Sequence, residues 1–94
     1  MSDNQQTSKI NFEEVLDITM VFQYHEQLNQ LLNEKKKICL NAENIERVDG
    51  AGLQLIVAFI LSAEKLNLQI SWSGVSQAFK DSAKILGVTE NLKL

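Results

Sequence analysis

The segment Asp49-Gly50-Ala51-Gly52-Leu53 is the part of the sequence whose residue types and spacing best suit a binding site. Glycines at positions 50 and 52 allow a tight turn and the close approach of a partner's backbone. An aspartate before a helix can accept hydrogen bonds from the free N–H groups of the first turn. Helix N-termini attract anions, but Asp49 would repel a phosphate, and the Gly-Lys-Ser/Thr ending of a P-loop is missing. The segment therefore predicts either a binding turn or a simple capped turn.

Few other side chains are arranged for catalysis or for a metal. Cys39 lies in a short apolar run, which predicts a buried, inert thiol, and a single cysteine excludes an internal disulfide. His25 is the only histidine, and we expect it to pack on a helix or at its edge. The pairs Glu13-Glu14 and Glu43/Glu46 are expected to be solvated. We therefore expect no enzyme activity, no metal site and no cofactor.

Strand-like and helix-like patterns alternate around the turn. Alternating or short apolar runs predict strands over Ile10–Leu16, Ile38–Leu40 and Leu68–Trp72. Helical spacing predicts helices from Ile18 to about Asn33, from Ala51 to about Leu66, and from Ser76 to Leu86. The predicted cap and turn residues are Asp17 and Ser76 at helix starts, Gly87 at a helix end, and Ser73-Gly74 in a turn.

This order of elements predicts an α/β domain. Crossovers of this length favour parallel strands with right-handed connections. We expect a small mixed or mostly parallel sheet of about four strands, packed with about three to four helices. Residues 10–94 would form a single domain, and the polar residues 1–9 would form a flexible N-terminus.

Charge and hydropathy exclude several classes of partner. The net charge is −3, whereas nucleic-acid-binding proteins usually carry a basic face. The run Lys35–Lys37 is expected in a solvated turn between two elements. No segment approaches the ~20 apolar residues needed to cross a bilayer, and no signal peptide is evident. We expect no direct membrane insertion and a cytoplasmic location.

The turn and its flanks resemble the signature of the STAS family, which anti-sigma factor antagonists typify. In that family a strand ends in a loop of the form Asp-Ser-Ser-Gly-Leu, and the loop opens a helix. Asp49 matches the aspartate, and Gly52 and Leu53 match the final glycine and leucine. Gly50 and Ala51 stand where the serines would be. The resemblance extends over roughly residues 10–88, with about one strand before the first helix where the family has a two-strand start.

The resemblance implies a regulatory module that binds another protein. In relatives a partner kinase phosphorylates the second serine of the loop, and Ala51 offers no hydroxyl for this switch. The residues that the resemblance and the helix pattern assign to partner binding are Asp49, Gly50, Ala51, Gly52, Leu53, Leu55 and Phe59.

The family offers several kinds of partner. The resemblance implies a switch kinase-like anti-sigma factor or a component of a signalling or chemotaxis cascade. Two alternatives are an accessory STAS subunit on the ATPase of a lipid-transport ABC system and a nucleotide-sensing domain. We expect no tight nucleotide binding, because a P-loop is missing. The sequence leaves open a weak homodimer.

The helix after the turn has a wider apolar arc than a surface helix needs. The arc is centred on Ile56 and Ile60, with Leu55, Phe59 and Leu66 along one edge and Val57 and Leu61 along the other. Either neighbouring elements cover both edges, or one edge is an interface. We expect the partner to contact the loop from Asp49 to Leu53 and one edge of this helix.

Overall fold

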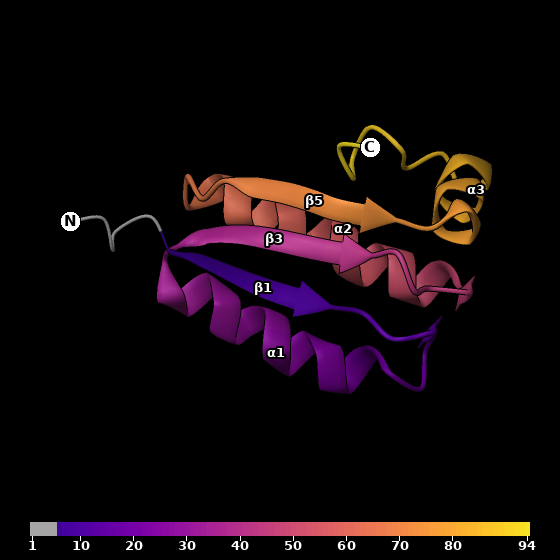
Figure 1. Ribbon diagram of the computed structural model, residues 1–94, viewed down its shortest axis with the longest axis horizontal. Helices are drawn as coiled ribbons and strands as arrows, with labels where there is room; N and C mark the ends of the chain where they lie inside the picture. Colours follow the sequence, from indigo (N-terminus) through magenta and orange to yellow (C-terminus); the bar gives the residue numbers. More distant parts are fainter. Residues whose placement is uncertain (1–5) are drawn as a thin grey trace.

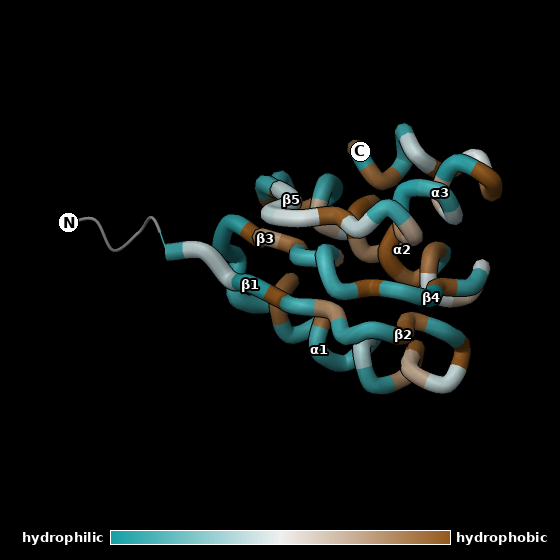
Figure 2. The backbone as a smooth tube through the Cα atoms, turned by 45° about the vertical axis from the view of Figure 1, so that its right-hand side comes forward, coloured by the Kyte–Doolittle hydropathy of each residue, from teal (hydrophilic) through white to brown (hydrophobic). Residues whose placement is uncertain are grey.

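Parallel strands form the centre of the computed structural model, which describes residues 6–94 (Figure 1). The main sheet contains β1 (Thr7–Asn11), β3 (Lys37–Ala42) and β5 (Ile70–Val75), in the order β1-β3-β5. β2 (Val15–Leu16) and β4 (Arg47–Val48) form a separate parallel pair. This pair lies beyond the carboxyl ends of β1 and β3 (Figure 2). The prediction of an α/β fold with mostly parallel strands is confirmed.

Helices connect the parallel strands, because such strands need a crossover. α1 (Val21–Glu34) joins the first pair of strands to β3, and α2 (Gly50–Lys65) joins β4 to β5. Both helices pack on the same face of the main sheet, and α3 (Gln77–Ile85) lies near the carboxyl end of β5 (Figure 1). As a result, the N-termini of α1 and α2 and the carboxyl ends of the strands lie at one end of the molecule.

The core lies between the main sheet and the two crossover helices. Successive side chains of a strand point to opposite faces, so every second residue is buried. Side chains that are fully or almost fully buried include Ile38 and Leu40 of β3, Leu28 of α1, and Ile56 and Ile60 of α2. Cys39, between the two β3 residues, lies on the opposite face and is half-buried. The prediction of a buried Cys39 thiol was wrong, because the alternation along β3 places this side chain on the face opposite the core.

The N-terminal part of the chain is more ordered than predicted. β1 begins at Thr7, before the predicted boundary at residue 10. Ser8 is buried, and its hydroxyl donates a hydrogen bond to the Glu34 carboxylate of α1. The prediction of a flexible N-terminus is therefore wrong for Thr7–Lys9, and residues 1–5 lie outside the described residues.

The single strand predicted over Ile10–Leu16 is two strands. The chain leaves the main sheet after Asn11, although the Phe12 N–H still donates to the Asn41 carbonyl at 3.0 Å. It then enters the pairing of β2 with β4. Two strands therefore precede α1, where the sequence predicted about one.

α1 starts later than predicted. The Asp17 carboxylate accepts hydrogen bonds from the backbone N–H and the hydroxyl of Thr19, at 3.0 and 2.5 Å. Asp17 therefore closes a local turn and does not cap the helix, whose N-cap is Met20 without a side-chain bond. Ile18, predicted to begin the helix, lies in the loop before it, and Ile18 and Phe22 are 66% and 75% exposed.

In the last third of the chain, the predicted helix caps Ser76 and Gly87 are confirmed, whereas the predicted turn at Ser73-Gly74 is wrong. Ser76 Oγ accepts a hydrogen bond from the Phe79 N–H at 3.1 Å, and Gly87 follows α3 with a φ of 72°. Ser73-Gly74, predicted as a turn, lies inside β5. The glycine pairs with Asn41 where the register shifts between β3 and β5, and bulges favour glycine. Beyond α3, the Leu92 carbonyl accepts a bond from Trp72 Nε1 at 2.8 Å.

Candidate partner-binding site

The Asp49 carboxylate holds the turn at the start of α2. One oxygen accepts a hydrogen bond from the Gly52 N–H at 2.9 Å, which caps the helix as predicted. The other oxygen accepts from the Ile18 N–H at 3.1 Å. The Asp49 N–H in turn donates to the Leu16 carbonyl at 3.3 Å. One residue therefore joins the start of α2 to the end of β2 and to the loop before α1.

The two glycines of the turn have different roles. A Cβ added at Gly52 would lie 2.3 Å from the Leu16 carbonyl oxygen, so β2 and α2 can meet this closely only because position 52 has no side chain. A Cβ at Gly50 would lie 3.9 Å from Leu86 Cδ1, which is an ordinary contact. Only Gly52 is required by the packing.

The predicted site residues divide into surface and supporting positions. Gly50 is exposed, and Asp49 and Ala51 are half-buried at the tip of the turn. Gly52 and Leu53 are buried, and the Leu53 side chain is 0% exposed. The surface of the turn therefore comes from residues 49–51, which residues 52 and 53 support from below.

Leu55 and Phe59 lie under α1 rather than on the surface. They are 9% and 4% exposed, and they share a small hollow with Leu28 and Leu32 of α1. A role in partner contact does not fit this burial. His25 is exposed at the rim of the same hollow, in keeping with the predicted edge position.

The opposite edge of the α2 apolar arc is covered only in part. Val57 is 8% exposed, whereas Leu61 is 48% exposed. Leu66, beyond the last turn of α2, is 45% exposed. The neighbouring elements therefore cover most of the arc, and the uncovered part lies away from the turn.

Exposed apolar side chains flank the turn, and the sequence did not reveal them as surface residues. Ile18 is hydrogen-bonded through its N–H to Asp49, and Phe22 follows in the first turn of α1. On the other side, Leu86 lies beside Gly50 and is 49% exposed, and Ile85 precedes it. We call the surface formed by Ile18, Phe22, Gly50, Ala51, Ile85 and Leu86 the docking face.

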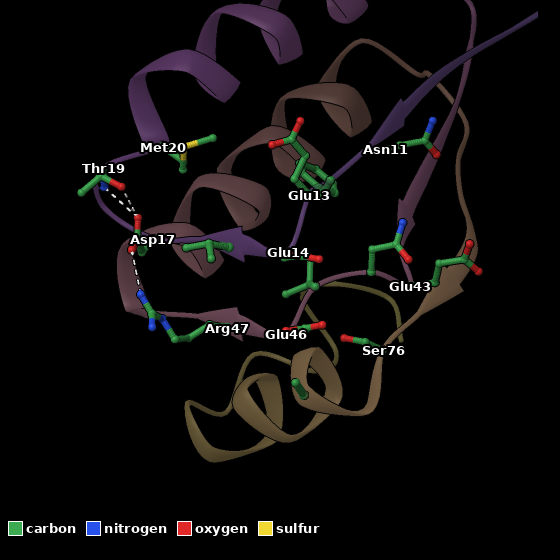
Figure 3. A pocket seen from close by; sticks show the side chains of 15 residues that line it. Asn11, Glu13, Glu14, Asp17, Thr19, Met20, Glu43, Glu46, Arg47 and Ser76 are labelled. Carbon is green, nitrogen blue, oxygen red and sulfur yellow. Dashed lines mark hydrogen bonds and ion pairs between the residues drawn. The ribbon is translucent and has the colours of Figure 1, made fainter.

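An open hollow of about 1100 Å³ adjoins the docking face at the carboxyl ends of the strands (Figure 3). The carboxylates that line it are Glu13, Glu14, Asp17, Glu43 and Glu46, with Arg47 as the basic residue among the lining side chains. We call this feature the acidic hollow. The sequence predicted solvated glutamates, but it did not predict that the fold gathers them around one hollow.

Asp17 is the best-connected carboxylate of the acidic hollow. Its hydrogen bond from the Thr19 hydroxyl is the main cause that lowers its pKa below the ordinary value of 3.8. The Thr19 N–H and the Arg47 guanidinium, whose Nη2 lies 3.9 Å from the carboxylate, lower this pKa further. Figure 3 shows the contacts of Asp17 with Thr19 and Arg47.

The sequence matches the family model described as "Mlab, STAS domain" over residues 1–94. The chain belongs to the STAS family. A search of curated proteins found no match to this STAS domain. Among solved structures, a sulfate transporter family protein from Wolinella succinogenes is similar, with a TM-score of 0.73 and 20% sequence identity. The alignment covers 92% of this chain and 70% of that chain, and at this identity it shows a shared fold.

STAS domains are generally non-catalytic modules that mediate protein interactions. The turn that resembles the family signature lies at the N-terminus of α2, where the docking face meets solvent. Among residues 6–94, no helix has the length and hydropathy to cross a membrane. The same residues contain no cluster of three or more His, Cys, Asp or Glu side chains placed to hold a metal ion.

Proposed function

We propose that this STAS domain is a non-catalytic regulatory module that binds another protein through the docking face. The main support is the exposure of large apolar side chains beside the turn: Ile18, whose N–H binds Asp49, is 66% exposed, and Leu86, beside Gly50, is 49% exposed. Apolar side chains around a rigid, capped turn suit a partner surface with its own apolar anchors.

The docking face has no phosphate switch at the turn. Positions 50 and 51 lack hydroxyl groups, so a kinase cannot add charge there. Binding would therefore be controlled by the amount of partner or by changes in the partner. The partner class that we propose is a switch kinase-like anti-sigma factor or a component of a signalling or chemotaxis cascade.

A second candidate is an accessory subunit docked on the ATPase of a transporter. Two observations favour it: the family model is described as "Mlab, STAS domain", and the similar solved structure is of a sulfate transporter family protein. Nucleotide sensing has less support, because the carboxylates of the acidic hollow would repel phosphate groups.

Ala51→Asp tests the proposed function. A carboxylate in the first turn of α2 is compatible with the helix dipole, so the free energy of unfolding should change by less than about 0.5 kcal/mol. A partner that covers the turn would have to desolvate this charge, so binding should weaken by at least about tenfold. Thermal unfolding and affinity capture from the native cells, with partners identified by mass spectrometry, measure the two effects.

Ala58→Asp is the matched control, because Ala58 is exposed on α2 away from the turn. It should retain the partner that Ala51→Asp loses. Equal recovery with both variants would place the interface elsewhere. The identity of the specifically lost protein, an ATPase or a signalling protein, separates the two candidate functions.

A further inference from the structure

The acidic hollow contains charge that the fold does not neutralise. Among residues 6–94, the side chains of Glu13, Glu14, Glu43 and Glu46 take part in none of the hydrogen bonds or ion pairs. Arg47, the basic residue of the lining, contacts Asp17 instead. Like charges held together in a concave surface focus their field into it and attract cations.

The backbone holds these carboxylates in place. The Glu14 carbonyl accepts hydrogen bonds from the N–H groups of Glu46 and Arg47, at 2.7 and 3.0 Å. The Glu43 N–H donates to the Asn41 side chain at 3.0 Å. These bonds and the β2–β4 pairing keep the backbones of Glu14 and Glu46 side by side, so both side chains start from the same wall of the hollow.

The acidic hollow and the docking face are continuous. Asp17 and Thr19 line the hollow, and Ile18 between them belongs to the docking face. Met20 also lines the hollow, and Phe22 follows it by two residues in the first turn of α1. A single partner segment that covers this loop would meet carboxylates on one side and exposed apolar side chains on the other.

We propose that the acidic hollow belongs to the partner-binding surface and receives a cationic, partly apolar segment of the partner protein. Lysine or arginine side chains of that segment enter the hollow, and its apolar side chains contact Ile18 and Phe22. The inference rests on the proposed function for the docking face and adds the charge of the partner. Unpaired carboxylates at the rim of an interface act mainly on the rate of association and on its dependence on salt.

A second copy of this chain fits the observations less well. Its run Lys35–Lys37 is exposed at the amino end of β3, so the charges would match. No large apolar side chain is exposed within Glu34–Lys37 itself, and Leu66, exposed at the same end of the molecule, is a single apolar side chain beyond α2. A head-to-tail contact through the lysine run would therefore cover the apolar half of the surface less completely than a segment that carries its own apolar side chains.

A designed peptide tests the inference without knowledge of the partner. The probe is a synthetic amphipathic helix of lysine and leucine, titrated into the ¹⁵N-labelled protein, and the control peptide has glutamate in place of lysine. We expect amide shifts confined to the lining of the acidic hollow and to the docking face, which together lie within residues 11–22, 43–51, 76–78 and 85–86. We expect the affinity to fall at least about tenfold between about 50 and about 300 mM salt. Binding of the glutamate peptide to the same residues, or shifts elsewhere, would overturn the inference.

Charge reversal at the hollow supplies the matched comparison. Glu14→Lys/Glu46→Lys should weaken binding of the lysine peptide at least about tenfold. Glu64→Lys/Glu90→Lys changes the net charge equally at two exposed positions outside the hollow and the docking face, and should leave the affinity within about twofold. Equal losses in the two variants would mean that net charge alone attracts the peptide, and the inference would be wrong.

Two further measurements separate this inference from the proposed function. If Ala51→Asp abolishes capture of a cellular partner and Glu14→Lys/Glu46→Lys does not, the docking face is correct and the cationic segment is wrong. Sedimentation at low salt tests the second copy. If the protein forms oligomers that Lys36→Glu disperses, the occupant of the hollow is another copy of this chain, and the inference is overturned.

Discussion

At the scale of single residues, the turn at the start of α2 depends on the Leu16 carbonyl. It accepts a hydrogen bond from Asp49, and the same oxygen leaves no room for a side chain at Gly52. The pattern of the sequence suggested glycine at both position 50 and position 52 for the shape of the turn. Only the structure separates the two, because the contact at Gly52 comes from β2, which is more than thirty residues earlier in the chain.

Gly52→Ala should therefore destabilise the domain by about 1–3 kcal/mol or more, because the new methyl group forces β2 away from α2. Gly50→Ala provides the control. Its methyl group has space, and the less flexible unfolded chain should make this variant as stable as the wild type or more stable by up to about 1 kcal/mol. Urea unfolding of both variants checks the difference, and equal stabilities would contradict the close contact at Gly52.

Asp17 gives the loop before α1 a dependence on pH. Its pKa is lowered in the folded state, mainly by the Thr19 hydroxyl, so the ionised carboxylate favours the folded loop. This contribution is complete above the ordinary value of 3.8 and is lost as the pH falls from there through the lowered pKa. The protection of the Thr19 amide against hydrogen exchange, relative to its intrinsic rate at each pH, should fall across that range.

Asp17→Asn is the control for this titration. The asparagine keeps an acceptor for Thr19 but does not ionise, so exchange at Thr19 should no longer follow the titration of a group with a pKa below 3.8. An unchanged pH profile in the variant would assign the effect to another carboxylate.

At the scale of elements, the sequence predicted best where its signals were local. The bounds of α2 were predicted well, because an aspartate cap, a glycine turn and a long apolar pattern agree there. β2 was merged with β1 into one predicted strand and β4 was missed, because strands of two residues have no periodicity to detect. Ser73-Gly74 looked like a turn because glycine is common in turns, and only the register shift opposite Asn41 explains it within a strand.

The C-terminal turn after α3 covers one side of the core. Leu92 is 0% exposed, and its carbonyl binds the indole of Trp72, which packs on Phe79 with ring centroids 5.5 Å apart. The final residues therefore close one side of the core. Their contribution to stability comes from the buried Leu92 side chain and from the hydrogen bond between Trp72 Nε1 and the Leu92 carbonyl.

Leu92→Ala should lower the free energy of unfolding by about 2–5 kcal/mol, because it leaves a cavity beside Trp72. The tryptophan emission should also shift to longer wavelength in the folded variant as water reaches the indole. Leu94, 38% exposed, is the comparison, and Leu94→Ala should cost less than about 1 kcal/mol. Urea unfolding followed by tryptophan fluorescence gives both values, and similar losses for the two variants would mean that Leu92 does not close the core.

At the scale of the whole molecule, the charges are unevenly distributed. The carboxylates of the acidic hollow lie at the carboxyl ends of the strands, and Lys35–Lys37 lie at the amino end of β3. The net charge of −3 conceals this separation. Glu14 and Glu46 are distant in the sequence, and they come together because the parallel pairing of β2 with β4 places their segments side by side. The turn could therefore be predicted from the sequence, whereas the hollow and the exposed flanks of the turn could not.

The way in which the turn is supported also affects how this protein can evolve. Asp49 caps the helix and Gly52 sets the distance to β2, so the Ala51 side chain has no part in shaping the backbone. A hydroxyl at position 51 can thus be lost or gained while the fold keeps its stability. Relatives with serine at this position would differ from this chain in their regulation but not in their architecture. A single substitution, Ala51→Ser, would therefore place a hydroxyl at the turn without compensating changes elsewhere in the domain.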